Sequence, residues 1–367
     1  MIMNRILFLS GSRYSLFNCI RLAKSDKFSS CQCDIILFVD KNMIGIASNL
    51  KKENIFDNII ECSFINNLDT FKKVALYLNP KYIRKYCKFI DEKFFDVQYD
   101  TVISQSMLYI SLLQRVYGKN IEAYLIEEGL STYTNRVNDV HNRSIFYRLF
   151  NLFLLHQKQV QIRGCYVNKP TIMVSNNINN YIIPPLSDEI VNCLKRVFNY
   201  HYVNMERNNI TFLGSPYYGI KALLKNNQIV SSNFEEICSN IVKKIFAECN
   251  ENITYRKHAR EDNHIENEFS NILLDCNDNI WELISKDEIT DNTVLISFFS
   301  TAAFTPKLLY DSEPYVIFLY GILEEEMYNA KYLTNKLCEC YKSKNKVIVP
   351  SSINEVLDIL RSIAHES

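Results

Sequence analysis

Glycine and proline are scarce in this chain, at eight each in 367 residues, and the formal net charge is zero. Low glycine and proline exclude collagen-like and low-complexity chains. Forty-one basic residues balance 41 acidic ones, which removes the electrostatic case for a nucleic-acid partner. No apolar run approaches the roughly 18 residues of a membrane-spanning helix, and the apolar stretch at 2–9 is too short for a signal peptide. A cytoplasmic protein is expected, with that stretch as a buried strand.

Disulfide and metal motifs are also missing. The twelve cysteines follow no framework, and the Cys31/Cys33 and Cys338/Cys340 pairs are separated by one residue instead of the two usual in zinc knuckles. Reduced thiols that serve as small hydrophobic side chains are expected. The chain shows no Asp-x-Asp after a strand, HExxH, G-x-S-x-G or Walker motif, so no metal is predicted. The acidic stretch 275–278 is predicted to be a solvated loop.

The composition is that of a folded protein, with 47% hydrophobic and 22% charged residues. Its length predicts two domains. Strand-like runs alternate with helix-like segments, which is typical of parallel sheets with crossover helices. The predicted fold class is α/β, with two Rossmann-like doubly wound domains that face each other across a cleft. The predicted parts are an acceptor-side domain at 1–185, a linker at 186–208, a nucleotide-sugar domain at 209–350 and a C-terminal helix at 351–367.

The predicted elements follow from apolar periodicity and cap signals. The first series has five strands, at 6–9, 35–39, 58–60, 99–103 and 123–126. The second has six, at 209–213, 253–255, 271–274, 293–296, 315–319 and 346–349. Helices are predicted up to residue 22 and over 44–50, 71–89, 186–198 and 353–364, and Pro184-Pro185 separates the two series.

An acidic pair, Glu127 and Glu128, follows the predicted strand 123–126. Gly129 behind it permits a sharp turn. Adjacent carboxylates raise each other's proton affinity, and one at this point can accept a proton from an attacking hydroxyl. The alternative is a solvated acidic turn.

A cationic loop containing Arg256, Lys257 and His258 follows the predicted strand 253–255. A phosphate that bound there would hold the protonated imidazole and receive its hydrogen bond or proton. The alternative is a structural histidine.

Hydroxyl groups follow other predicted strands. Ser300 and Thr301 precede a helix whose first N–H groups would add to a phosphate site. The alternative, that one of them only caps the helix, is compatible with this role. Gly214-Ser215 opens the second half much as Ser12-Arg13 follows the first strand, and both pairs are assigned to substrate binding.

The stretch 143–163 combines an apolar helical face with basic residues at its fringe. A buried helix, a homodimer face and a peripheral contact with the inner membrane remain open.

The order of these motifs, acidic-acidic-Gly, then a basic loop with histidine, then a Ser-Ser/Thr pair, resembles bacterial sialyltransferases of the GT-B type. The flanks resemble glycosyltransferase family fifty-two, which includes lipooligosaccharide α-2,3-sialyltransferases, and bacterial polysialyltransferases share the three signatures. Ala259 stands where the family usually has proline, and the hydroxyl pair reads Ser-Thr instead of Ser-Ser.

The resemblance implies an inverting, metal-independent transfer of sialic acid from CMP-sialic acid to a sugar hydroxyl, with galactose favoured, on an oligosaccharide or glycolipid of the bacterial surface. Glu127, or its neighbour Glu128, would be the base. His258 would donate to the departing CMP phosphate, and Ser300 with Thr301 would hold that phosphate. No cofactor is implied besides the donor. Two alternatives stay open: a related transferase that uses another nucleotide sugar such as CMP-Kdo, and a non-catalytic glycan-binding protein of the same fold.

Overall fold

The computed structural model describes residues 4–38, 43, 45–62, 97–106, 110, 121–133, 162–174, 178–202, 209–215, 233–258, 261, 268–275, 278–324 and 327–366. The chain divides into two compact units, Met1–Tyr200 and His201–Ser367, and each is treated by itself below. The predicted helix at 71–89 and residues 143–161 of the amphipathic stretch lie outside the described residues.

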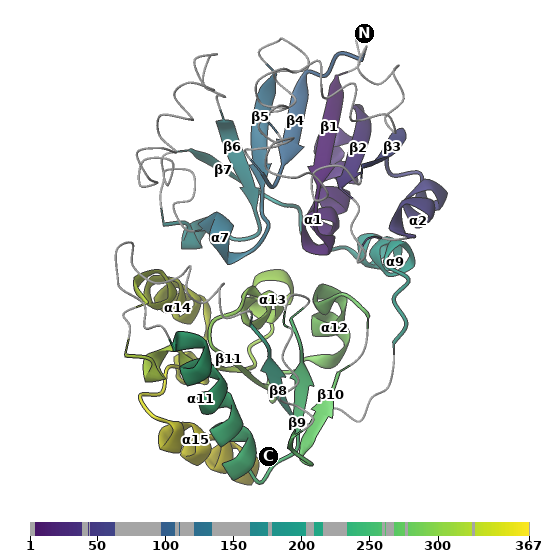
Figure 1. Ribbon diagram of the computed structural model, residues 1–367. Helices are drawn as coiled ribbons and strands as arrows, with labels where there is room; N and C mark the ends of the chain where they lie inside the picture. Colours follow the sequence, from purple (N-terminus) through teal and green to yellow (C-terminus); the bar gives the residue numbers. More distant parts are fainter. Residues whose placement is uncertain are drawn as a thin grey trace. The chain divides into compact units, whose positions relative to one another are not determined.

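The first unit contains a seven-stranded sheet in the order β3-β2-β1-β4-β5-β6-β7, with every pair parallel (Figure 1). Its strands are β1 Arg5–Ser10, β2 Gln32–Phe38, β3 Asn58–Cys62, β4 Thr101–Ser104, β5 Glu122–Ile126, β6 Ile162–Val167 and β7 Asn179–Ile182. The five predicted strands are confirmed. The sequence missed β6 and β7, and β6 includes Ile162 and Arg163, which the prediction placed at the end of the amphipathic stretch.

Apolar residues on both faces explain the central strands of this sheet. Ile6, Leu7, Phe8 and Leu9 of β1 are all buried, as expected where helices cover both sides of a parallel sheet. The order reverses direction between β1 and β4, because β1 leads outward to β2 while β4 leads to β5 on the other side. Open α/β sheets bind ligands at such a switch point, beyond the carboxyl ends of the strands.

Three longer helices belong to the first unit: α1 Arg13–Ala23, α2 Ile46–Glu53 and α9 Asp188–Val197. Ser187 caps α9, which begins within the predicted helix 186–198, and its Oγ accepts a hydrogen bond from the Ile190 N–H at 3.3 Å. Helix α9 contacts α1 and α2, and the Arg196 guanidinium donates to both Glu53 carboxylate oxygens at 2.6 and 2.7 Å. This part of the predicted linker therefore packs on the first unit. The shorter helices are η1 Asp26–Phe28, α7 Leu130–Tyr133 and η3 Pro170–Ile172.

The second unit contains a six-stranded parallel sheet in the order β10-β9-β8-β11-β12-β13 (Figure 1). Its strands are β8 Ile210–Leu213, β9 Ile253–Arg256, β10 Ile272–Leu274, β11 Val294–Ser297, β12 Tyr315–Phe318 and β13 Val347–Ile348. All six predicted strands are confirmed. The switch point lies between β8 and β11, so the two sheets confirm the prediction of two doubly wound α/β halves.

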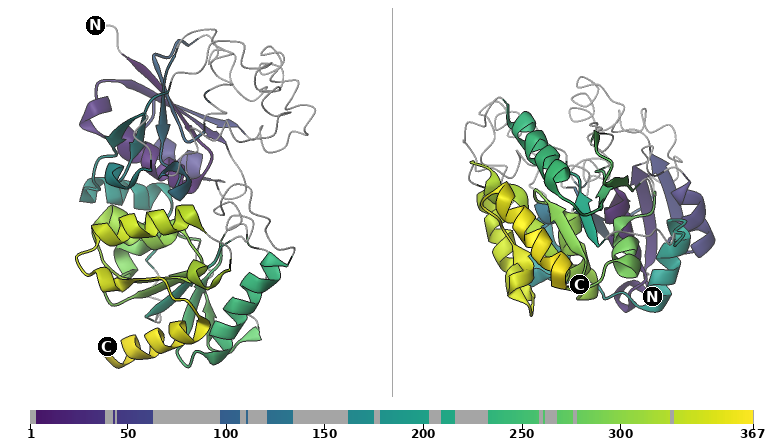
Figure 2. Two further views of the ribbon diagram at one scale, coloured as in Figure 1. Left: turned by 90° about the vertical axis from the view of Figure 1, so that its left-hand side faces the viewer. Right: turned by 90° about the horizontal axis from the view of Figure 1, so that it is seen from below.

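The helices of the second unit connect these strands. Helix α15 lies beside α11, and α12 contacts α13 (Figure 2). Phe246 of α11 contacts the rings of Phe212 and Tyr255 on β8 and β9, which places α11 on one face of the sheet. The helices are α11 Phe234–Glu248, α12 Trp281–Glu288, α13 Thr301–Tyr310, η5 Leu319–Ile322, α14 Tyr328–Cys340, η6 Lys344–Lys346 and α15 Ile353–Glu366. Among the described residues, no helix is long and apolar enough to cross a membrane.

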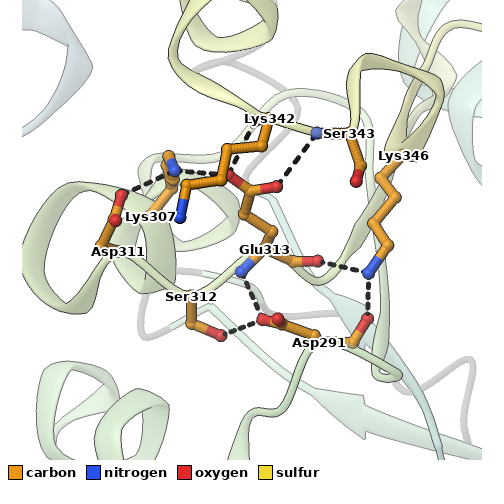
Figure 3. A network of polar contacts seen from close by, with 8 residues as sticks. All are labelled: Asp291, Lys307, Asp311, Ser312, Glu313, Lys342, Ser343 and Lys346. Carbon is orange, nitrogen blue, oxygen red and sulfur yellow. Dashed lines mark hydrogen bonds and ion pairs between the residues drawn. The ribbon is translucent and has the colours of Figure 1, made fainter.

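A charged network joins the amino ends of β11, β12 and β13 (Figure 3). At its centre Lys307 Nζ lies 2.6 Å from Glu313 Oε1, and both side chains are buried. Glu313 also accepts hydrogen bonds from the N–H groups of Lys342 and Ser343, at 2.8 and 3.1 Å. These contacts lower the pKa of Glu313 to about 2, although its burial acts in the opposite direction. The network therefore lies at the amino ends of these strands, whereas the predicted motifs lie at the carboxyl ends.

Candidate functional site

The acidic pair lies where the sequence predicted it, directly after β5 at the carboxyl edge of the first sheet. The Glu127 N–H donates to the Tyr166 carbonyl at 2.9 Å and so extends the strand pairing by one residue. Gly129 has a φ of 134°, a conformation that glycine adopts most easily. The chain then turns directly into the short helix α7.

The Glu127 carboxylate is completely buried. Oε1 accepts a hydrogen bond from the Tyr14 hydroxyl. Oε2 accepts bonds from the Tyr133 hydroxyl at 2.5 Å, the Asn168 N–H at 2.7 Å and the Asn168 side-chain amide at 3.0 Å. Desolvation raises the pKa of Glu127, and the hydrogen bonds from the two tyrosines and Asn168 oppose it. Burial is therefore the main cause of the raised pKa, and not the neighbouring carboxylate as the sequence suggested.

Glu128, in contrast, is exposed to solvent. Its N–H donates to Thr132 Oγ1 at 3.0 Å, and the Thr132 N–H donates to the Gly129 carbonyl at 2.9 Å, which closes the turn. The two adjacent acids therefore differ in environment: Glu127 is enclosed by protein groups, and Glu128 is exposed.

A buried arginine is connected to the Glu127 carboxylate through Asn168. Arg21 of α1 is 3% exposed and donates to Asn168 Oδ1 at 2.6 Å, to Asn18 Oδ1 at 3.0 Å and to the Pro184 carbonyl at 2.7 Å. Asn168 thus accepts from Arg21 and donates to Glu127, so its amide orientation is fixed at both ends. Sequence reasoning missed Tyr14, Arg21, Tyr133 and Asn168. Tyr14 follows the predicted pair Ser12-Arg13, but no sequence pattern marks Asn168.

Ser12 and Arg13 lie where β1 turns into α1, beside the switch point of the first sheet. Ser12 is the N-cap of α1, and its Oγ accepts a hydrogen bond from the Ser15 N–H at 3.1 Å. Both residues are half-buried. Their assignment to substrate binding stays a prediction, and the contacts give Ser12 a structural role.

In the second unit, Arg256 ends β9 and is followed by Lys257 and His258. Arg256 Nη1 lies 2.7 Å from Asp275 Oδ2, its Nη2 donates to the Asn279 carbonyl at 2.6 Å, and its guanidinium lies 5.7 Å from the Trp281 ring centre. Asp275 is buried. The prediction that 275–278 is a solvated loop is therefore wrong at Asp275, because an ion pair compensates its burial.

His258 is half-buried and fixed through its backbone. Its N–H donates to Glu261 Oε2 at 3.1 Å, and the Glu261 N–H donates to the His258 carbonyl at 2.9 Å. The Tyr255 hydroxyl holds the other Glu261 oxygen at 2.5 Å. The sequence predicted only cations around the imidazole. The structure shows that the loop also contains a carboxylate, that of Glu261. Ala259, at the position where the family has proline, lies outside the described residues.

Gly214 follows β8 and touches the His258 loop. Its N–H donates to the Arg256 carbonyl at 2.8 Å. A Cβ at Gly214 would lie 2.1 Å from Glu261 Oε2 and 3.0 Å from the His258 nitrogen, so any larger residue would displace the Glu261 side chain and press on the His258 backbone. Ser215 is 8% exposed, and its Oγ has no hydrogen-bond partner within the described part of the chain.

Ser300 and Thr301 follow β11, the other strand at the switch point of the second sheet. Ser300 caps α13, and its Oγ accepts a hydrogen bond from the Ala302 N–H at 3.3 Å. The predicted cap is therefore confirmed. Both residues are half-buried. Since β8 pairs with β11 and β9, the structure brings Gly214, His258 and Ser300 to one edge of one sheet.

Each predicted motif thus stands at the carboxyl edge of its own sheet. The acidic pair belongs to the first unit, and His258, Ser300 and Thr301 belong to the second. Within the residues that the structure describes, no group of three or more histidine, cysteine, aspartate or glutamate side chains could hold a metal ion.

Comparison with known proteins gives remote structural similarities. No family model matches the chain, and no curated protein matches it. A glycosyltransferase from Rickettsia africae ESF-5 is 15% identical over 100% of both chains, with a TM-score of 0.44. The spinosyn forosaminyltransferase SpnP is 11% identical, over 99% of this chain and 92% of its own, with a TM-score of 0.48. The GT-B domain of a sialyltransferase from Photobacterium damselae is 12% identical, over 95% of this chain and 99% of its own, with a TM-score of 0.48.

Proposed function

We propose that this protein is an inverting, metal-independent glycosyltransferase of the GT-B type that moves sialic acid from CMP-sialic acid to a sugar hydroxyl of a bacterial surface glycan. The observation that carries the proposal is the position of the three motifs. Each stands at the carboxyl end of a parallel strand, and Ser300-Thr301 stands at a switch point. Doubly wound sheets bind their ligands at these ends.

The second unit supplies the chemistry for the leaving group. When the bond from the anomeric carbon to the phosphate oxygen breaks, its electron pair stays on the CMP phosphate. His258 donates a hydrogen bond or proton to that phosphate, and the N-terminus of α13 with Ser300 and Thr301 holds it. Charge that develops on the phosphate is stabilised by these donors, so the proposal needs no metal.

The first unit supplies the base. As the acceptor hydroxyl oxygen forms its bond to the anomeric carbon from the opposite face, its proton passes to the acidic pair. The raised pKa of Glu127 suits a base that works near neutral pH, whereas Glu128 is the exposed member of the pair. Galactose is the acceptor sugar proposed, on an oligosaccharide or glycolipid at the cytoplasmic face of the inner membrane.

Donor cleavage tests the proposal. CMP release is measured from CMP-sialic acid and from CMP-Kdo, each with and without a simple galactoside. CMP release is expected only from CMP-sialic acid, and it should depend on the presence of the galactoside. Release from CMP-Kdo alone would support the related transferase, and no release from either donor in any condition would contradict catalysis by this site.

Three substitutions test the residues. Glu127→Gln, Glu128→Gln and His258→Ala are compared with Glu189→Gln, a surface acid paired with Lys24 on the first unit. A catalytic acid or base contributes about 10²- to 10⁴-fold to the rate, so a loss of that order is expected for His258→Ala and for at least one acid of the pair. Wild-type rates in all three variants would refute the catalytic assignment.

A further inference from the structure

The enclosure of Glu127 limits how it can act on an acceptor. Its carboxylate has no exposed surface, and Oε2 already accepts three hydrogen bonds. A direct contact between this carboxylate and a sugar hydroxyl would require breaking some of these bonds. Oε1 accepts its bond from Tyr14, so a proton that arrives at Glu127 can come through a donor already in place.

Tyr14 is suited to be that donor. It lies in the first turn of α1, beside the switch point of the first sheet, and is half-buried, whereas Glu127 and Tyr133 are completely buried. Its ring stacks on Phe17 at 6.5 Å with an interplanar angle of 15°, which fixes the ring. The Asn168 side-chain amide donates to the Tyr14 oxygen at 3.2 Å, which leaves the phenol proton directed at Glu127.

We infer that Tyr14 is a catalytic residue that relays the acceptor proton to Glu127; this inference rests on the proposed function. The acceptor hydroxyl gives its proton to the Tyr14 oxygen, while the phenol proton of Tyr14 passes to Glu127 Oε1. The acceptor oxygen bonds to the anomeric carbon, and the electron pair of the broken bond leaves with the CMP phosphate. Tyr14 ends the step neutral and Glu127 ends it protonated, so protons and electrons balance.

The other donors to Glu127 are not suited to this role. Asn168 donates through amide N–H groups, which do not exchange a proton on the scale of a catalytic step. Tyr133 has a hydroxyl, but it is completely buried and also accepts a bond from the Lys169 N–H at 3.2 Å. Tyr133 therefore serves as an internal reference for Tyr14, since both are tyrosines bonded to the same carboxylate.

The titratable groups around Glu127 come from three elements. Tyr14 and Arg21 belong to α1, Tyr133 to α7, and Cys165 to β6, where burial and the nearby Glu127 charge raise the pKa of the thiol to about 12. Arg21 is the cation of the group, and it acts through Asn168. Because hydrogen bonds couple Tyr14, Glu127 and Tyr133, a pH profile reports the cluster as a whole.

The test compares Tyr14→Phe with Tyr133→Phe in the full-length protein, with CMP-sialic acid and a galactoside. Tyr14→Phe keeps the ring and removes one oxygen. We expect kcat to fall about 10²-fold or more, the acid limb of the kcat–pH profile to move, CMP affinity to change little, and Tm to fall because a buried carboxylate loses a donor. Tyr133→Phe removes the other phenol from the same carboxylate, so it is expected to lower Tm as well, with a clearly smaller loss of kcat than Tyr14→Phe; equal losses of kcat would argue against a relay through Tyr14.

A second variant keeps the hydroxyl and changes its proton affinity. Site-specific replacement of Tyr14 by 3-fluorotyrosine lowers the phenol pKa, and the relay predicts that the acid limb moves to lower pH. An unchanged profile in this variant, or wild-type kcat in Tyr14→Phe, would overturn the relay. If wild-type protein itself transfers no sugar, the proposed function fails; an active wild type with a fully active Tyr14→Phe variant rejects the relay alone.

Discussion

Gly214 and His258 lie in direct backbone contact at the carboxyl edge of the second sheet: a Cβ on Gly214 would stand 3.0 Å from the His258 nitrogen. The His258 N–H donates to Glu261, and the Glu261 carboxylate would lie still closer to the added Cβ. The position of the histidine is therefore coupled to the absence of a side chain at residue 214.

Gly214→Ala is expected to displace the His258 loop. Relief of this contact needs a movement of a few tenths of an ångström in the His258 backbone. Since a shift of about 1 Å in a catalytic group can cost on the order of 10²-fold in rate, this smaller shift should lower kcat by about 10-fold, measured as CMP release. Gly45→Ala is the matched control, since an added Cβ meets nothing within 4 Å there. Its φ of 81° makes that change strained, so it should lower Tm with little effect on kcat. Equal kcat losses in both variants would contradict the coupling.

The two hydroxyls before α13 are expected to differ in their effects, because both are proposed to hold the donor phosphate and Ser300 also caps the helix. Thr301→Ala should weaken CMP binding by about 1–3 kcal/mol if a charge-assisted hydrogen bond is lost, with Tm nearly unchanged. Ser300→Ala removes the cap, at a cost of about 1 kcal/mol in stability. Calorimetric titration with CMP and thermal melts measure the two effects.

Ser352→Ala is the control for capping alone, because Ser352 Oγ accepts a bond from the Glu355 N–H at the start of α15. It should lower Tm about as much as Ser300→Ala and leave CMP affinity unchanged. An unaltered CMP affinity in Thr301→Ala would remove that residue from the donor site.

Acid should weaken the Lys307–Glu313 network. The pKa of Glu313 is about 2 in the folded protein, against 4.5 for an ordinary glutamate. A depressed pKa stabilises the fold above the ordinary value, and this stability is lost as the pH falls from about 4.5 towards 2. Each pKa unit corresponds to about 1.4 kcal/mol, so the contribution is at most about 3–4 kcal/mol. The difference between the melts of wild type and Glu313→Gln should be full at pH 7, shrink below about pH 4.5 and vanish only below the folded pKa of about 2; a difference as large at pH 2 as at pH 7 would contradict this origin.

Arg21 is expected to support the acidic pair through Asn168. Arg21→Met removes the donor from three acceptors in a buried site, which should cost about 2–4 kcal/mol of stability. Lys24→Met, one position beyond the end of α1, removes only a pair with the exposed Glu189 and should cost less than about 1 kcal/mol. Denaturant unfolding measures both changes, and equal effects would argue against a structural role for the buried cation.

The fold was largely predictable because the strands are continuous apolar runs bounded by polar turns. The exceptions have physical reasons. In β6 the run contains Arg163 and Gly164, and β7 begins with two asparagines at the edge of the sheet, so neither shows the expected pattern. Gly164 is required because a Cβ there would lie 2.4 Å from the Tyr181 ring of β7. That pairing of distant residues is invisible to local periodicity.

The candidate site was predictable only where it follows strands. Glu127, His258 and Ser300 were found because strand ends are readable from the sequence. Tyr14 and Asn168 were not, since their contacts with Glu127 join positions 113 and 41 residues away. The burial that divides Glu127 from Glu128 is likewise a property of the assembled sheet and not of the dipeptide.

Each sheet is built entirely from strands of its own unit, and α9 completes the first unit before the chain enters the second. Among the strands that the structure describes, neither half borrows one from the other. A recombination point near residue 201 would therefore cut no strand pairing, and gene fusion could exchange one half while the other kept its complete sheet. If the proposed function holds, the recognition of the donor and the recognition of the acceptor can therefore evolve separately.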